Sequence, residues 1–207
     1  SNSRHTGGVI LYIREGIKFN KIATVAYDKS WFATISIEDA NLQITVVYKS
    51  PAQKPNDFFN FLEQYISKYL DYSAPQIMVG DININVNRNT KTVKDYINVI
   101  KEHNLKQIVK DFTRFDIKNN SSSIIDHVLV NNDRTSCVIN RVDKISDHYL
   151  LLITYNEIVN LKCENSEVNV IRNYAKEIFL FFFIGIWVLK PSYINKLCPS
   201  NCIRISS

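Results

Sequence analysis

Short apolar runs in the first part of the chain predict β-strands. The run GVILYI at 8–13 ends at a glycine-containing turn at 14–16, and alternating apolar residues predict two more strands at 31–37 and 42–48. Only the short acidic turn at 38–41 separates the last two strands. We therefore expect them to form an antiparallel hairpin.

Two other stretches have the period of a helix. After a pair of prolines, apolar residues recur at spacings of three and four, which predicts an amphipathic helix over 57–70 with Asn56 as its N-cap. A second helix is predicted over about 92–103, and Asn104 is its expected C-cap.

Between the predicted helices lies QIMVGDININ at 76–85, a buried strand that runs out into polar residues. Antiparallel strands interleaved with a few helices predict an α/β fold with mixed or antiparallel sheets. Beyond the second helix, strands are expected at 105–109, 124–130, 137–142 and 149–155, with a loop at 112–123.

The segment IFLFFFIGIWVL at 178–189 departs from this pattern. It is shorter than the roughly 20 apolar residues that a membrane-spanning helix needs. It could be a buried strand or helix, a membrane-interface segment or read-through sequence. We expect it to lie outside the main fold.

Composition narrows the protein class only slightly. A chain of 207 residues with 45% apolar and 22% charged residues is typical of a globular domain, alone or with a tail. The net charge of +5 is compatible with a polyanionic partner and does not require one. The chain begins without Met or a signal peptide, so we expect a fragment; four cysteines without disulfide or CxxC spacing predict an intracellular, reducing environment.

The first candidate for chemistry follows the buried strand. Gly80 allows a close backbone approach or a turn, and Asp81 and Asn83 would leave the same face if the chain stayed extended. A carboxylate beside a carboxamide can accept a proton or bind a metal and hold a reacting oxygen. A polar turn rich in Asp and Asn explains the same residues.

Two Asp-His pairs follow at predicted strand ends. Asp126-His127 begins one strand, and Asp147-His148 precedes another. Either dipeptide alone is more often a solvated strand end, and His127 is expected to point away from Asp126 as a structural residue. Together with Asp81, however, the ordered set contains the parts of a metal-assisted hydrolase.

These motifs resemble a known superfamily. GDININ, SSSIIDHV and ISDH, in this order, resemble the endonuclease/exonuclease/phosphatase (DNase I-like) superfamily, and most of all the apurinic-type endonuclease domain of non-LTR (LINE-like) retrotransposons. GGVILYIREGI, VVYKSPAQKPNDFFNFLEQ and FTRFD share the resemblance, which covers about residues 7–156. It implies a four-layered α/β sandwich of two mixed, mostly antiparallel sheets flanked by helices, incomplete at the N-terminus, over 1–157, with a tail at 158–207.

The resemblance also implies roles for the acidic set. Asp81 would orient or deprotonate the attacking water near the metal, and Asn83 would hold a phosphate oxygen. His148 would contact the scissile phosphate, with Asp126 orienting its imidazole. Asp147 would lie by the metal and water. The implied cation is Mg²⁺, with Mn²⁺ as the alternative.

Further residues are implied to meet the substrate. Tyr48 would lie near the phosphate, and Thr113 with Arg114 would touch the DNA backbone, although a strand aromatic and a loop would look the same in sequence. Four basic residues flank the expected site and are equally consistent with DNA contacts or with a solvated surface: Lys49, Lys54, Arg88 and Lys91.

One family residue has no counterpart. The glutamate that serves as a principal metal ligand would lie ahead of Gly7, and Glu15 and Glu38 follow the wrong strands. We therefore expect metal-dependent DNA nicking at target sites to be impaired. An inactive remnant that binds nucleic acid or protein is the alternative, and a phosphodiesterase acting on lipid or nucleotide is a third.

The implied partners are DNA and, in an intact element, the upstream part of the domain and a reverse transcriptase. No small-molecule cofactor and no membrane are expected. A functional retrotransposon product would act in the nucleus.

Overall fold

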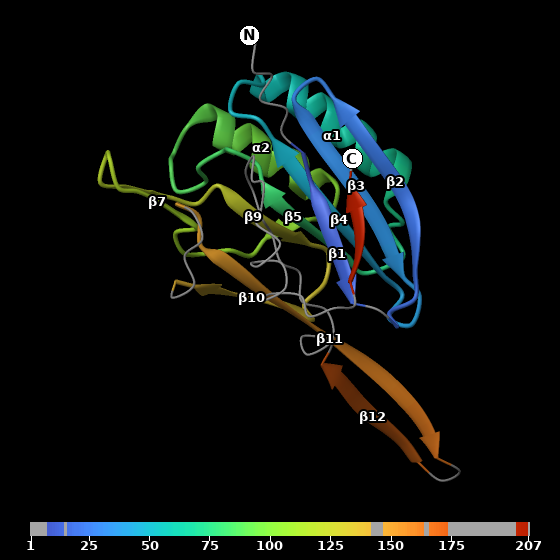
Figure 1. Ribbon diagram of the computed structural model, residues 1–207. Coiled ribbons are helices and arrows are strands. Elements are labelled where there is room, and N and C mark those ends of the chain that lie inside the picture. The colour runs from blue at the N-terminus through green and yellow to red at the C-terminus, as the bar shows by residue number, and fades with distance from the viewer. Residues whose placement is uncertain (1–7, 15, 142–146, 164–165, 174–201, 207) are drawn as a thin grey trace.

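The computed structural model describes residues 8–14, 16–141, 147–163, 166–173 and 202–206. Its centre is a six-stranded mixed sheet with two helices on one face (Figure 1). The predicted mixed α/β class is confirmed. In spatial order the strands of this sheet are β2 (Phe19–Tyr27), β3 (Ser30–Ile37), β4 (Leu42–Lys49), β5 (Gln76–Asp81), β9 (Asp126–Val130) and β6 (Lys106–Gln107).

The predicted hairpin is present and has an extra neighbour. β3 and β4 pair antiparallel, as expected, but β3 also pairs with β2, for which no strand was predicted. β2 lies at the edge of the sheet, and of its side chains only Ala23 is buried. Because its polar and apolar residues do not alternate clearly, the pattern gave no strand signal.

The two helices are α1 (Pro55–Tyr69) and α2 (Lys91–Glu102), each within two residues of its predicted start. The predicted cap Asn56 is wrong, because Pro55 occupies the first helical position and Lys54 is the N-cap. At the end of α2, His103 is the C-cap, and Asn104 follows it with a left-handed φ of 56°. An Asn tolerates that conformation better than most residues.

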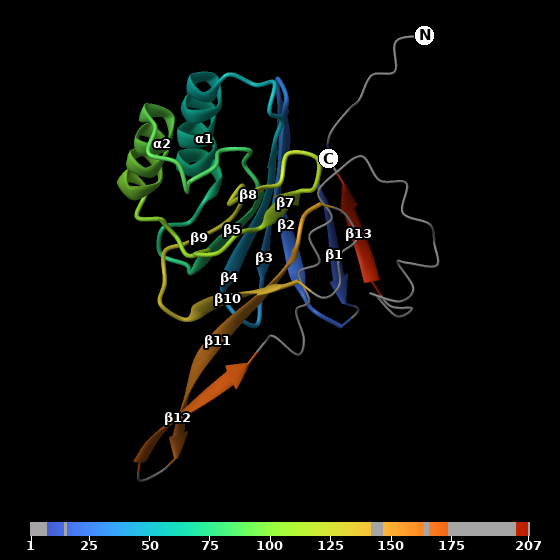
Figure 2. The same ribbon diagram turned by 90° about the vertical axis from the view of Figure 1, so that its left-hand side faces the viewer.

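Both faces of the central sheet are covered. One core lies between the sheet and the helices and contains Phe58, Leu62, Tyr96 and Met78. The other lies against β1 (Ile10–Arg14), β10 (Thr135–Asn140) and β11 (Leu150–Cys163) and includes Leu11, Leu151 and Ile153. Figure 2 shows the helices on one side of the sheet and β1 with β13 (Cys202–Ser206) on the other.

β11 passes the predicted domain boundary without a break. Its first half pairs with β10 and its second half with β12 (Ser166–Asn173), in a hairpin that projects from the rest in both views (Figures 1 and 2). The boundary predicted after residue 157 therefore falls inside a strand. The apolar segment at 178–189 lies outside the described residues. Among those described, no helix is long and apolar enough to cross a membrane.

Two short strands occupy the stretch predicted as a loop at 112–123. β7 (Arg114–Asp116) and β8 (Ser121–Ser123) pair antiparallel and form a hairpin. Three-residue strands of mixed polarity are too short to leave a periodic signal.

Gly80 lets β5 lie close to β4. A Cβ built on Gly80 would lie 1.7 Å from the backbone oxygen of Val47, and Gly80 has a φ of 154°. Both facts make a side chain at this position incompatible with the observed strand pairing.

We expect Gly80→Ala to destabilise the protein by about 3 kcal/mol or more, because the backbone of β4 or β5 must move to relieve the clash. Equilibrium urea unfolding measures this change. Gly8→Ala is the matched control, since a Cβ there meets nothing within 4 Å. Equal midpoints for the two variants would contradict the explanation.

Candidate active site at the ends of β4, β5 and β9

Strand register brings three predicted site residues together. Tyr48 on β4 pairs with Asp81 on the parallel strand β5, and Asp81 pairs with Asp126 on the antiparallel strand β9. Directly paired residues point to the same face of a sheet, so the three side chains lie in a row. The row lies at the strand ends, on the face away from the helices, and Asp81 and Asp126 are 4% and 1% exposed.

A short backbone pairing brings His148 to the row. Phe115 of β7 donates to the carbonyl of Asp147 at 2.9 Å, and Tyr149 donates to the carbonyl of Thr113 at 2.7 Å. His148 lies between these two bonds, and its Nδ1 is 2.9 Å from Asp126 Oδ2. The Asp126 carboxylate therefore fixes the orientation of the His148 imidazole, while the catalytic roles implied by the resemblance stay predictions.

Asp81, Asp126 and His148 form a compact polar group. One ligand atom from each lies within 4.8 Å of the other two. Carboxylate oxygens are the donors that hard divalent cations prefer, so the chemistry of the group fits such an ion. No other group of this kind is found among the described residues.

Burial and neighbouring charges shift the pKa values of Asp81 and His148. Burial raises the pKa of Asp81 to about 7, and the negative charge of Asp126 adds to the rise, while the charge of His148 and the hydrogen bonds from Asn83 oppose it. Burial alone would lower the pKa of His148, but its hydrogen bond to Asp126 and the surrounding carboxylates raise it. A cation beside the carboxylates would relieve their repulsion.

Asn83 does not lie on the same strand face as Asp81, so the prediction of an extended pair is wrong. β5 ends at Asp81, and Asn83 has a left-handed φ of 51°. Its backbone N–H donates to Asp81 Oδ1 at 2.9 Å, and its Nδ2 donates to the carbonyl of Lys49 at 2.8 Å. The polar turn that was the alternative is what forms. It also fixes the Asn83 side chain beside Asp81.

Thr113 holds the backbone at the start of β9, next to Asp126. It is fully buried, and its hydroxyl accepts the backbone N–H groups of Ile125 and Asp126 at 3.2 and 3.1 Å. These bonds fix the start of β9 and hence the Asp126 carboxylate. In this arrangement the hydroxyl faces the protein backbone, whereas the predicted role placed it on DNA.

Asp147 is paired outside the group. Its Oδ2 accepts from Arg114 Nε at 2.6 Å, and it is not among the three clustered residues. Partial burial raises the pKa of Asp147, but the hydrogen bond and the charges of Arg114 and His148 outweigh that effect and lower it. The ion pair therefore engages one carboxylate oxygen of Asp147, and its role beside the metal stays a prediction.

Tyr48 is half-buried at the other end of the row. Its ring lies 5.7 Å from that of Trp31. Burial raises the pKa of its phenol, and the nearby Asp81 carboxylate raises it further, against a smaller opposite effect of Ser50. The phenol is therefore protonated at neutral pH and can act as a hydrogen-bond donor.

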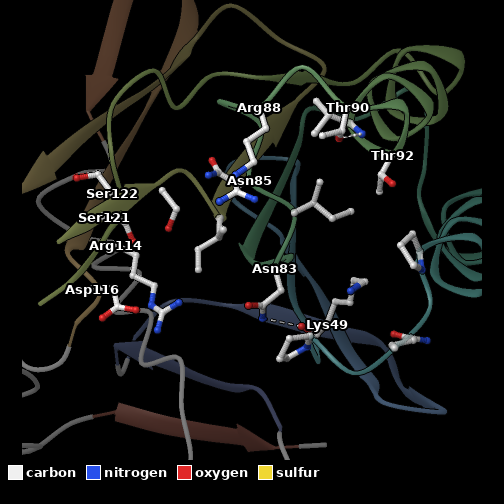
Figure 3. Close-up of a pocket in the computed structure, with 17 residues that line it drawn as sticks. Lys49, Asn83, Asn85, Arg88, Thr90, Thr92, Arg114, Asp116, Ser121 and Ser122 are labelled. Atoms are coloured by element: carbon white, nitrogen blue, oxygen red, sulfur yellow. Dashed lines mark hydrogen bonds between the residues drawn. The ribbon is translucent and has the colours of Figure 1, made fainter. Parts of the chain in front are cut away.

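A polar cavity of about 430 Å³ begins at Asn83. Its walls come from the loop after β5, the starts of α1 and α2 and the β7–β8 hairpin (Figure 3). Of the four flanking basic residues, Lys49 and Arg88 line it, while Lys91 pairs with Asp95 at the surface. Polar residues that the sequence had not singled out also line it: Asn85, Thr90, Thr92, Ser121, Ser122 and Ser123.

His127 has the structural role that was predicted. It is fully buried on the helix side of β9, with Nδ1 2.9 Å from the Tyr96 hydroxyl and Nε2 3.3 Å from the carbonyl of Ile124. Burial lowers its pKa to about 4, which keeps the ring neutral.

Comparison with known proteins gives one family. A sequence model of the family described as "Endonuclease-reverse transcriptase" matches residues 42–152, a range that contains Tyr48, Asp81, Asp126 and His148. No curated protein matches the chain.

The chain resembles solved structures at low identity, and the first of these shows the fold. The endonuclease domain of TRAS1, a telomere-specific non-LTR retrotransposon, aligns with a TM-score of 0.53 and 15% identity over 66% of this chain and 65% of its own. An AP endonuclease from Archaeoglobus fulgidus aligns with a TM-score of 0.49 and 14% identity, over 60% and 64%. The chain thus spans less than two thirds of these relatives' lengths.

We expect Thr113→Val to destabilise the protein by about 1–3 kcal/mol, because the change keeps the side-chain shape but leaves two buried N–H groups without their acceptor. Urea unfolding measures the loss. Thr24→Val is the control, since the buried Thr24 hydroxyl has no hydrogen-bond partner in the described part of the chain and its removal should cost nothing. If both variants unfold at the same midpoint, the hydroxyl of Thr113 does not hold β9.

Proposed function

The chain belongs to the endonuclease-reverse transcriptase family, and from this membership we propose that it carries a metal-dependent endonuclease domain that hydrolyses phosphodiester bonds of DNA. The observation that supports the proposal most is the meeting of Asp81, Asp126 and His148, from three distant parts of the sequence, in one group at the sheet end. The resemblance to non-LTR retrotransposon endonucleases supports DNA as the substrate.

Asp81 and Asp126 would hold the cation, which we propose is Mg²⁺, with Mn²⁺ as a substitute. When bound, such an ion supplies positive charge for the phosphoryl oxygens and lowers the pKa of a water molecule. A metal contact from Asp147 would require its ion pair with Arg114 to open.

The other steps of the proposed reaction belong to four side chains: Asp81, His148, Asn83 and Tyr48. Asp81 would orient or deprotonate the attacking water, because its carboxylate lies in the group that would hold the cation. His148, with its pKa raised by Asp126, would donate to a non-bridging phosphate oxygen. Asn83 and Tyr48 would add neutral donors on either side.

The cavity beside Asn83 would take the DNA backbone. Arg88 and Arg114 line it together with hydroxyl and amide side chains, a combination typical of phosphate contacts. Arg114 would thereby link the bound strand to Asp147. This assignment concerns backbone contacts and carries no base specificity.

The finer proposal is that the domain nicks DNA at a target site, within an element that also supplies a reverse transcriptase, and acts in the nucleus. We also propose the four-layered, DNase I-like sandwich for the whole domain. Among the described residues, the candidate metal group consists of Asp81, Asp126 and His148. It contains two carboxylates and no glutamate, so we expect slow cleavage. The same observation favours the alternative, a domain that binds nucleic acid without cutting it.

We expect the chain to convert supercoiled plasmid slowly to open circles when Mg²⁺ is present, and Asp81→Asn to lower the rate by about 10²- to 10⁴-fold, because the water loses its base and the metal a ligand. Agarose gels measure the nicking. Asp39→Asn makes the same chemical change at an exposed turn and should nick normally. Equal rates for both variants would remove Asp81 from the mechanism.

Metal binding has a separate readout. Mg²⁺ at about 100 times its Kd should stabilise the fold by about 2.7 kcal/mol, seen as a rise in Tm in a thermal-shift assay. Asp81→Asn should abolish that rise, and Asp39→Asn should retain it. A rise of the same size in Asp81→Asn would place the ion elsewhere, and no rise in the unaltered chain would favour the binding module.

A further inference from the structure

Lys49 is a buried cation with few partners. It is the last residue of β4 and is 2% exposed. Its ammonium donates one hydrogen bond, to the carbonyl of Ser50 at 3.1 Å, and lies 5.9 Å from the centre of the Phe58 ring. No carboxylate among the described residues lies within ion-pair distance. An ammonium has three donors, and among the described residues that of Lys49 has one acceptor, so it can donate further hydrogen bonds to a ligand.

This residue lines the cavity that begins at Asn83. The two residues are joined, because Asn83 Nδ2 donates to the backbone carbonyl of Lys49 (Figure 3). Asn83 also bonds Asp81 through its backbone. Asn83 and Lys49 therefore connect the metal group, through Asp81, to the lining of the cavity.

Two helices begin at the same cavity. Pro55 at the start of α1 and Thr90, Thr92 and Val93 at the start of α2 line it. Pro55 has no N–H, and the N–H of Val93 is already bound by the Thr90 hydroxyl, so each helix contributes chiefly the positive end of its dipole. Of the lining residues only Asp116 is acidic. The cavity is thus built to accept negative charge.

We propose that this cavity is a second phosphate subsite, in which the Lys49 ammonium binds a non-bridging oxygen of the DNA phosphodiester next to the one that is cut. The inference rests on the proposed function, since it places a DNA strand across the metal group. Phosphate oxygens would supply the acceptors that the ammonium lacks in the free protein. Adjacency follows from Asn83, which contacts both the metal group and the Lys49 backbone.

The effect of replacing Lys49 on folding stability distinguishes a lysine that binds phosphate from one that serves only packing. A buried cation without a counter-charge costs folding free energy, and an apolar side chain of similar length avoids that cost. Replacing Lys49 should therefore weaken DNA binding without weakening the fold. A lysine that served only packing would show the opposite behaviour.

The test compares Lys49→Met with Lys54→Met, which removes the same charge from a position that is exposed and does not line the cavity. Binding of a short fluorescent DNA duplex is measured by anisotropy over a series of NaCl concentrations. Lys49→Met should bind about 10- to 100-fold more weakly, as expected for the loss of a charged hydrogen bond, with a salt slope smaller by about 1. Lys54→Met should change affinity less than about twofold, and neither variant should have a lower Tm.

A second measurement uses a duplex whose backbone linkages are neutral methylphosphonates. It tests whether the loss of affinity depends on phosphate charge, whatever the stability of the variant. The difference between Lys49→Met and the unaltered chain should vanish on this duplex, because the ammonium has lost its anionic partner. The inference is overturned if Lys49→Met binds like Lys54→Met, or if its defect persists on the neutral duplex together with a lower Tm.

The two proposals fail separately. Normal DNA binding by Lys49→Met, while Asp81→Asn still stops nicking, overturns the subsite alone. An unaltered chain that neither nicks nor binds DNA overturns both.

Discussion

The register of β5 between β4 and β9 is the constraint on which the rest of the site depends. It sets Tyr48, Asp81 and Asp126 side by side, and it is possible because Gly80 has no side chain to separate the strands from Val47. A slip by one residue would turn the carboxylates toward the helices. The positions of these three side chains are therefore set by the pairing of the buried strand β5 with its two neighbours.

Around that row, most charged side chains have a hydrogen-bonded partner. Asp126 holds His148, Asp147 holds Arg114, and Thr113 fixes the backbone from which Asp126 projects. Of the buried lysine and aspartate side chains that the structure describes, only Asp81 and Lys49 form no ion pair. Under the proposed function these two are the groups that would meet the metal and the phosphate, so binding would complete what folding leaves unbalanced.

The sequence predicted most elements whose apolar residues follow one period, including both helices, the β3–β4 hairpin and the buried strand before Asp81. It missed β2, where burial is one-sided and weak, and the short β7–β8 hairpin. At the candidate site, the roles of the residues stay predictions, and the sequence did not indicate all of their geometry. The turn at Asn83 depends on a left-handed residue, and the burial of Lys49 depends on α1 packing over it; neither leaves a mark in spacing or composition.

The depth of the carboxylates also restricts the shape of the substrate. Asp81 and Asp126 are almost inaccessible and project from a rigid sheet, so they cannot move outward to meet a straight duplex. Under the proposed function, the DNA must instead bend or widen to bring its backbone down to them. The energy of that deformation varies with base sequence, through the stiffness of A-tracts and the flexibility of pyrimidine–purine steps. A preference among target sites would then arise from the mechanics of the double helix, without a single contact to a base.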